Sequence, residues 1–122
     1  MTEYLEPADV DDFIASAGFH VRDRGLLLSA LSAPLPVFGE EVYLGLYNKA
    51  AALIIAINQN HPLFDGNKRL SWVLTKALLA LNGHDLVADS VADGDAFVRG
   101  IADHRLEFIE VVDWVEAHSD RL

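Results

Sequence analysis

The sequence predicts an all-α fold, a compact bundle of about six helices. Apolar residues recur at three- and four-residue spacing in six segments, and glycine, proline and polar residues separate these segments. The chain has 122 residues, which is the length of one domain with one hydrophobic core, and no internal repeat or change of composition divides it. We therefore predict a single domain over residues 1–122.

Two short helices are predicted in the first third of the chain. Residues 7–17 begin with proline and acidic side chains and are followed by Gly18, which are the usual start and stop signals of a helix. A second helix runs from residue 23 or 24 to residue 32, with leucine and alanine side chains on its inner face. Residues 33–39 contain two prolines that favour extended backbone, so this connection is not helical.

The centre of the chain contains two strongly apolar predicted helices. Residues 46–58 are apolar on nearly all sides, so this helix is expected to be buried, with Lys49 as an exception that keeps its charge in water. Residues 67–81 carry a clean helical stripe of apolar side chains, and Asn82–Gly83 provides a left-handed cap. We expect these two helices to pack together, with the intervening loop at their junction.

The last third of the chain predicts two more helices, over about residues 89–103 and 106–118. The acidic residues at the start of the first one are helix-start and surface residues rather than a metal site. His84 and Asp85 follow the preceding glycine cap, and we expect them to lie in a turn.

Composition and charge exclude several classes of function. The longest unbroken apolar run, residues 50–57, is far shorter than the roughly 18 residues of a membrane span. The net charge of −10 argues against direct binding of nucleic acid, which requires a basic surface. Cysteine is absent, so no disulfide framework is predicted, and the first residues lack the pattern of a signal peptide. We therefore expect a cytoplasmic protein with no membrane partner.

A polar loop between the two central helices concentrates the reactive side chains. Pro62 and Gly66 interrupt the helical pattern, and the second central helix begins directly after them. The first turn of a helix offers unpaired backbone N–H groups and a partial positive charge, and two cations, Lys68 and Arg69, stand at the same place. These features predict a phosphate-binding site.

Two further side chains of this loop add chemistry to the anion site. Asp65 is suited to hold Mg²⁺, which usually takes one or two carboxylates together with phosphate oxygens. Histidine exchanges protons readily at neutral pH, so His61 is a candidate general base for a hydroxyl. A base, a metal carboxylate and a phosphate cradle are the components of phosphoryl or nucleotidyl transfer.

A simpler explanation covers part of the loop. Asp65 and Asn67 are residue types that commonly cap helices. Capping does not explain Lys68 and Arg69, because the helix dipole disfavours cations at this end, so the two cations indicate a bound anion. The other four histidines are assigned no role and are expected to be structural or solvated: His20, His84, His104 and His118.

The stretch from His61 to Arg69 resembles the signature of the Fic/Doc family, H-x-F-x-[D/E]-[G/A]-N-[G/K]-R. Six defined positions match in register: His61, Asp65, Gly66, Asn67, Lys68 and Arg69. Leu63 stands where the family prefers a phenylalanine that packs beneath the loop, and either Leu63 or Phe64 is expected to take that place. The resemblance extends over about residues 20–118 and implies the compact Fic/Doc-type helical bundle.

The resemblance implies a reaction between Mg-ATP and a hydroxyl group of a protein. His61 would be the general base, and Asp65 would hold Mg²⁺. The phosphates of ATP would be bound by four residues: Gly66, Asn67, Lys68 and Arg69. The resemblance also implies that the segment around residues 34–39 forms a short β-hairpin flap, which holds a target segment by strand addition through Leu35, Pro36, Val37 and Phe38.

Lys68 is similar to the lysine of the Doc branch of the family. Members with glycine at this position mostly transfer AMP, whereas the Doc branch transfers the γ-phosphate. The resemblance therefore implies a Doc-like toxin of a toxin–antitoxin module, a kinase-like phosphotransferase that modifies a translation elongation factor of the Tu type and arrests translation. Two alternatives remain: AMP transfer to a protein hydroxyl, and a non-catalytic member that binds an antitoxin.

The resemblance also implies a partner that inhibits the protein. Many Fic proteins carry an inhibitory helix with the pattern [S/T]-x-x-x-E-[G/N]. The nearest match here, residues 2–7, is interrupted by Pro7. We therefore expect inhibition to come from a cognate Phd-like antitoxin.

Overall fold

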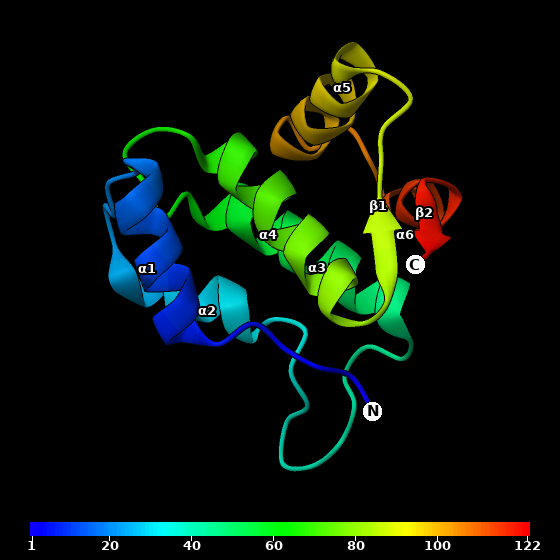
Figure 1. The fold of residues 1–122 in the computed structure, drawn as a ribbon, viewed down its shortest axis with the longest axis horizontal. Coiled ribbons are helices and arrows are strands. Elements are labelled where there is room, and N and C mark those ends of the chain that lie inside the picture. The colour runs from blue at the N-terminus through cyan, green and yellow to red at the C-terminus, as the bar shows by residue number, and fades with distance from the viewer.

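Six helices dominate the computed structural model, which describes all residues from 1 to 122 (Figure 1). In chain order the helices are α1 (Pro7–Ala17), α2 (Arg24–Ser32), α3 (Leu46–Asn60), α4 (Asn67–Leu81), α5 (Val91–Ala102) and α6 (Phe108–Ala117). The predicted all-α class is confirmed. The ends of three helices differ from the prediction by one or two residues. α3 is two residues longer, and α6 begins two residues later and ends one residue earlier. α5 begins after Ser90, whose hydroxyl accepts a hydrogen bond from the N–H of Asp93, and ends at Ala102.

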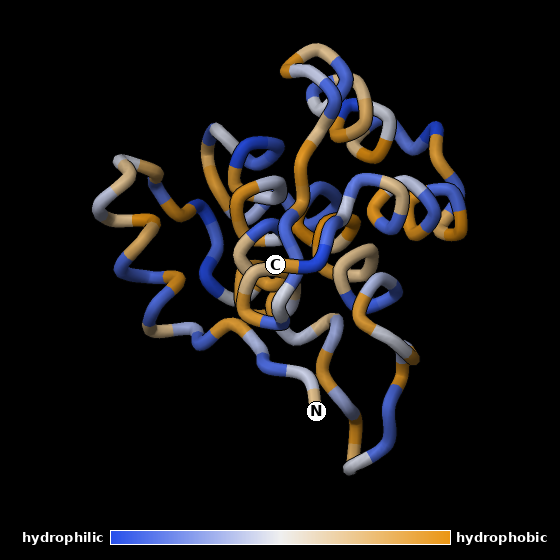
Figure 2. Tube along the Cα trace, turned by 45° about the vertical axis from the view of Figure 1, so that its right-hand side comes forward, coloured by the Kyte–Doolittle hydropathy of each residue, from blue (hydrophilic) through white to orange (hydrophobic).

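Helix α3 lies at the centre of the fold and packs against α2, α4, α5 and α6. It runs antiparallel to α4, with the polar loop joining the two helices (Figure 1). Three successive alanines, residues 50–52, are buried and allow neighbouring helices to approach α3 closely. Figure 2 shows apolar residues recurring along each helix, as amphipathic helices require. None of the helices combines the length and the hydrophobicity needed to cross a membrane.

Two short strands, one after α4 and one after α6, form a small antiparallel sheet. Strand β1 (His84–Leu86) pairs with β2 (Ser119–Arg121), with His84 opposite Arg121. The expectation that His84 and Asp85 lie in a turn is therefore wrong. Strands of three residues are too short to show an alternating pattern of apolar residues, so their pairing depends on the packing of α4 and α6 rather than on a local signal.

The connection between α2 and α3 contains the predicted flap in a reduced form. Val37 and Glu40 form a single β-bridge, in which each backbone N–H donates to the other residue's C=O, at 2.8 and 3.0 Å. The two residues between them, Phe38 and Gly39, have positive φ values of 50° and 80°, as a tight hairpin turn of type I′ requires. Val37 and Phe38 are exposed, and no longer strand continues the bridge.

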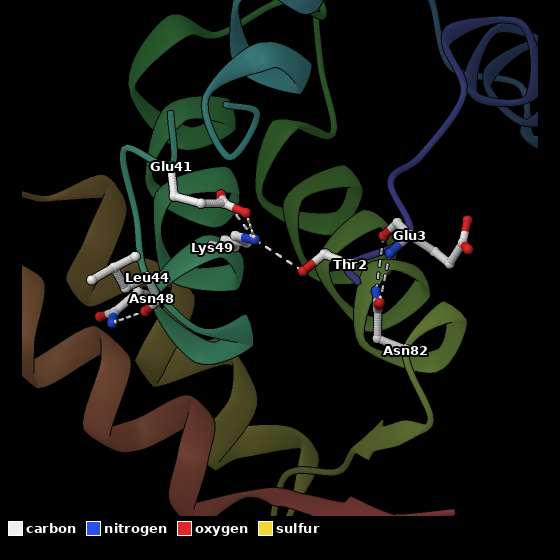
Figure 3. A network of polar contacts seen from close by, with 7 residues as sticks. All are labelled: Thr2, Glu3, Glu41, Leu44, Asn48, Lys49 and Asn82. Carbon is white, nitrogen blue, oxygen red and sulfur yellow. Dashed lines mark hydrogen bonds and ion pairs between the residues drawn. The ribbon is translucent and has the colours of Figure 1, made fainter. Parts of the chain in front are cut away.

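Lys49 in α3 is buried, with 3% of its surface exposed, so the expectation that its charge lies in water is wrong. Its Nζ donates to Thr2 Oγ1 at 2.9 Å and lies 3.1 Å from Glu41 Oε2 (Figure 3). Beside this contact, the backbone of Glu3 exchanges two hydrogen bonds with the side-chain amide of Asn82. Lys49 therefore joins the N-terminal segment to the connection that contains the flap, through a partner 47 positions away in sequence.

The environment of Lys49 raises its pKa. Burial alone lowers the pKa of this amine, but contacts with Tyr4 and Glu41 outweigh burial and hold the pKa above its ordinary value of 10.5. A group whose pKa is raised on folding stabilises the protein at pH values below the unfolded pKa. This stabilisation is lost as the pH rises through the folded pKa.

We therefore expect Lys49→Met to lower the free energy of unfolding at pH 7 by about 1–3 kcal/mol, the worth of hydrogen bonds to a charged group. Above pH 10.5 the wild-type protein should lose this advantage, so the difference between the two proteins should shrink. Urea titrations between pH 7 and pH 12 measure the free energy of unfolding of both proteins, with Glu41→Gln as a second variant that removes the same ion pair. A difference in free energy between wild type and variant that stays constant across this pH range would contradict the raised pKa of Lys49.

Candidate functional site

The polar loop between α3 and α4 is held against the segment that joins α1 to α2. The N–H of Phe64 donates to the C=O of His20 at 3.1 Å, and Leu63 forms a β-bridge with Val21. Leu63 is 1% exposed and belongs to the hydrophobic core, whereas Phe64 is 72% exposed. Leu63 therefore takes the packing position beneath the loop, and no shift of the loop brings Phe64 into that place.

Asn67 closes the loop from the first residue of α4. Its Oδ1 accepts from the N–H of Leu63 at 2.8 Å, and its Nδ2 donates to the C=O of Leu63 at 3.0 Å. These two bonds hold the loop in a closed turn, and Asn67 is buried, with 8% of its surface exposed. Because the side chain of Asn67 is engaged within the loop, its contribution to a bound phosphate would come from its backbone N–H.

His61 is exposed and has a left-handed backbone, with φ 50° and ψ 58°. Its Nδ1 lies 3.2 Å from Nδ2 of Asn67. Since the bonds to Leu63 determine which end of the Asn67 amide is nitrogen, and an amide nitrogen only donates, the contact assigns Nδ1 of neutral His61 as an acceptor. The lone pair of the ring therefore lies on Nδ1.

Gly66 precedes α4 and has a left-handed backbone with φ 89°. A Cβ atom added at this position would lie 2.5 Å from Cε1 of Phe19, which is closer than nonbonded carbon atoms approach. Glycine is therefore required here by both conformation and space, and an alanine would force Phe19 to move.

Lys68 and Arg69 lie in the first turn of α4 and are exposed. Neither forms an ion pair or a side-chain hydrogen bond with the protein, although the guanidinium of Arg69 lies 5.5 Å from the ring centroid of Phe19. No side chain caps the N-terminus of α4. Two unpaired cations beside uncapped amide groups form an arrangement that a bound anion would stabilise.

Asp65 is exposed beside the first turn of α4. Its Oδ1 accepts from the N–H of Gly66 at 2.9 Å, and its Oδ2 makes no hydrogen bond within the protein. No group of three or more metal-ligating side chains occurs in the structure. If phosphates bind at the first turn of α4, a single free carboxylate oxygen beside them would suit Mg²⁺, which usually takes one or two carboxylates together with phosphate oxygens and water.

A cavity of about 790 Å³ opens beside the start of α4. One end is polar and includes Asp65 and the first residues of α4. The other end is bounded by Trp72 and by residues of β1, α5 and the connection between them: Leu86, Val87, Ala88, Ser90, Val91, Gly94, Asp95 and Val98. Sequence reasoning missed this second wall, because its residues form no motif and reach the site only through the packing of α4 against β1 and α5.

The predicted site residues do not all lie together. The six matched residues lie in the polar loop and the first turn of α4, but the flap residues 35–38 lie elsewhere. α2 begins beside the polar loop, because the C=O of Pro62 accepts from the N–H of Asp23. α2 packs against α3 and runs antiparallel to it (Figure 1). The connection that follows α2 therefore lies at the far end of α3. With 15 residues, α3 separates its two ends by about 22 Å.

Comparisons with known proteins support the resemblance of this chain to the Fic/Doc family. A family model described as the Fic/DOC family matches residues 5–79. A protein of Mycolicibacterium smegmatis called Toxin Doc is 44% identical over 97 residues, which cover 76% of this chain and 75% of that protein. The matched region contains α1 to the greater part of α4, including the whole polar loop.

Proposed function

The chain belongs to the Fic/Doc family, and from this premise we propose that it transfers a phosphoryl group from Mg-ATP to a hydroxyl of a protein. One observation carries the proposal. A single loop presents an exposed histidine, a carboxylate and two unpaired cations at an uncapped helix N-terminus, beside a cavity of about 790 Å³. Two cations at this end of the helix are disfavoured by its dipole and do not stabilise the fold, so a bound anion is the better explanation for them.

The cavity supports a nucleotide as the ligand. Its polar end would receive the triphosphate, at the N–H groups of α4 and the side chains of Lys68 and Arg69. Its other end is lined mostly by apolar side chains, including Trp72 and Val98, against which a base could pack. His61 does not line the cavity, so a target hydroxyl would reach it from solvent while the nucleotide occupies the cavity.

The residues of the loop would divide the reaction between them. His61 takes the proton of the target hydroxyl at Nδ1 and loses its contact with Asn67. The hydroxyl oxygen forms a bond to the γ-phosphorus, the bond from that phosphorus to the bridging oxygen breaks, and ADP leaves. Lys68 and Arg69 hold the phosphate oxygens as charge develops on them. A Mg²⁺ ion held by Asp65 would neutralise charge on the phosphates.

Lys68 favours γ-phosphate transfer over AMP transfer, because a long cation in the cradle takes up room and adds charge where glycine would leave space. The test uses ATP labelled on either the α- or the γ-phosphate, with Mg²⁺ and a bacterial lysate, and compares wild type with His61→Ala. Label that passes to protein only from the γ-position, and is lost in the variant, supports the proposal. Label from the α-position would assign AMP transfer, and no transfer despite Mg-ATP binding would support a binding role.

We propose further that the protein is the toxin of a toxin–antitoxin module, by analogy with the relative called Toxin Doc. A translation elongation factor of the Tu type would be the target in the cytoplasm, and a Phd-like antitoxin would be the inhibitor. Induction of the wild-type chain alone should stop incorporation of labelled amino acids, and the labelled band should be the elongation factor. Continued protein synthesis while transfer activity is measurable in extracts would contradict the toxin role.

The flap segment would contact the target away from the reacting hydroxyl. Phe38 is fully exposed at its tip and Val37 is 53% exposed, but the connection that contains them lies at the far end of α3 from the polar loop (Figure 1). We expect Phe38→Ser to raise KM for the protein target by about 10-fold, as loss of one aromatic anchor of an interface does, and to leave the affinity for Mg-ATP unchanged. Steady-state kinetics with purified target measure both constants. An unchanged KM for the target would remove the flap from the interface.

A further inference from the structure

Arg22, in the short segment between α1 and α2, reaches the last turn of α3. Its Nε and Nη2 donate to the backbone C=O of His61 at 2.9 and 2.6 Å, and Nη2 also lies 3.2 Å from the C=O of Asn60. The guanidinium therefore caps the negative end of the α3 dipole from a position 39 residues away in sequence. No signal in the sequence distinguishes this arginine from Arg24, two residues later.

The backbone of Arg22 and Asp23 also hydrogen-bonds to the next residue of the loop, Pro62. The N–H groups of Arg22 and Asp23 both donate to the C=O of Pro62, at 2.7 and 3.1 Å. Three successive carbonyls, of Asn60, His61 and Pro62, are thus held by one dipeptide. The α1–α2 segment serves as a support for the loop, and Arg22 is its only side chain that hydrogen-bonds to the loop.

The middle one of these carbonyls belongs to the residue whose backbone is strained. His61 has φ 50°, in the left-handed region, which costs a residue other than glycine roughly 1–2 kcal/mol. Such a conformation persists only where surrounding contacts impose it. The direction of the His61 carbonyl depends on its ψ angle, so two hydrogen bonds to that oxygen restrict the backbone and the direction in which the imidazole leaves the loop.

We propose that Arg22 is a positioning residue, which holds His61 in its left-handed conformation and so keeps the imidazole beside Asn67 and the phosphate site. The proposal rests on the proposed function for the role of His61 as base. The competing explanation is that Arg22 only stabilises the end of α3. The two differ in outcome, because a purely structural cap changes the melting temperature and not the conformation or reactivity of His61 in the folded protein.

The test compares Arg22→Ala with Arg24→Ala. Arg24 is a matched control, since it is an exposed arginine at the first residue of α2, two positions from Arg22, and pairs only with Asp11, at 2.6 Å. We expect Arg22→Ala to lower kcat by about 10²-fold, as misplacement of a catalytic group does, with KM for Mg-ATP unchanged. Guanidinium ion at a non-denaturing concentration should restore part of the activity of Arg22→Ala and none of the activity of His61→Ala.

A second readout does not depend on activity. The Cα and Cβ chemical shifts of His61 report whether its φ is positive, and we expect them to change in Arg22→Ala and to stay unchanged in Arg24→Ala. Unchanged His61 shifts, or a wild-type kcat, in Arg22→Ala would overturn the proposal. If the wild-type chain transfers no label, the proposed function fails, while the chemical shifts still decide the role of Arg22. If Arg22→Ala does not fold, the same measurements are made on Arg22→Lys. Lysine retains the charge but cannot donate the two hydrogen bonds that the guanidinium makes to the C=O of His61.

Discussion

His61→Ala is expected to lower the rate of transfer to the protein target by about 10²–10⁴-fold, the usual contribution of a positioned general base. Its affinity for Mg-ATP should stay close to that of the wild type, because His61 does not line the cavity in which the nucleotide is proposed to bind. Single-turnover transfer of labelled phosphate measures the rate, and calorimetric titration measures the affinity.

His104→Ala is the matched control for this variant. His104 is also exposed and also has a left-handed backbone, with φ 58° against 50° for His61, so replacement by alanine has the same effect on the backbone at both positions. His104→Ala should transfer at the wild-type rate. Equal losses in the two variants would show that strain in the chain, and not the imidazole of His61, accounts for the effect.

The second large effect is expected for Lys68 and Arg69. Charge-assisted hydrogen bonds to phosphate are worth about 1.5–3 kcal/mol each, so Lys68→Ala and Arg69→Ala should each weaken Mg-ATP binding by about 10- to 150-fold. Because both cations are exposed and otherwise without ion pairs, the loss should diminish as salt is added. Arg105→Ala, which removes an exposed arginine that does not line the cavity, is the control.

The same substitutions should have the opposite effect on the stability of the free protein. Cations at a helix N-terminus oppose the dipole by about 0.3–1 kcal/mol, and this repulsion disappears with either side chain. We therefore expect the ligand-free variants to melt at or above the wild-type temperature, while they bind Mg-ATP more weakly. Variants that lose both stability and affinity would indicate that the two cations serve the fold rather than a ligand.

The sequence was sufficient to predict the elements whose signals are local. α1 and α4 begin and end where their proline, glycine and asparagine residues predict, and the apolar stripe of α4 identifies its buried face. The prediction of a phosphate site before α4 also used local signals, because its cations, glycine and helix start lie within four residues of one another, and it stays a prediction. Leu63 shows the limit of such reasoning: the pattern left two candidates for the packing position, and burial selects Leu63.

The features that sequence reasoning missed depend on contacts between distant residues. Lys49 is buried because Thr2 and Glu41 supply its partners, and neither partner is marked by the helical pattern of α3. Arg22 contacts His61 across 39 positions, and the second wall of the cavity comes from β1, α5 and the connection between them. The position of the flap follows from the antiparallel packing of α2 on α3, which composition and spacing do not determine.

A structure of the protein with Mg²⁺ and a non-hydrolysable analogue of ATP tests the central claim most directly. The proposal predicts phosphates at the N–H groups of the first turn of α4, within reach of Lys68 and Arg69, and a Mg²⁺ ion on Asp65. The base should occupy the apolar end of the cavity, between Trp72 and α5. An analogue bound elsewhere, or one whose phosphates point away from α4, would contradict the assignment of this loop as the centre of transfer.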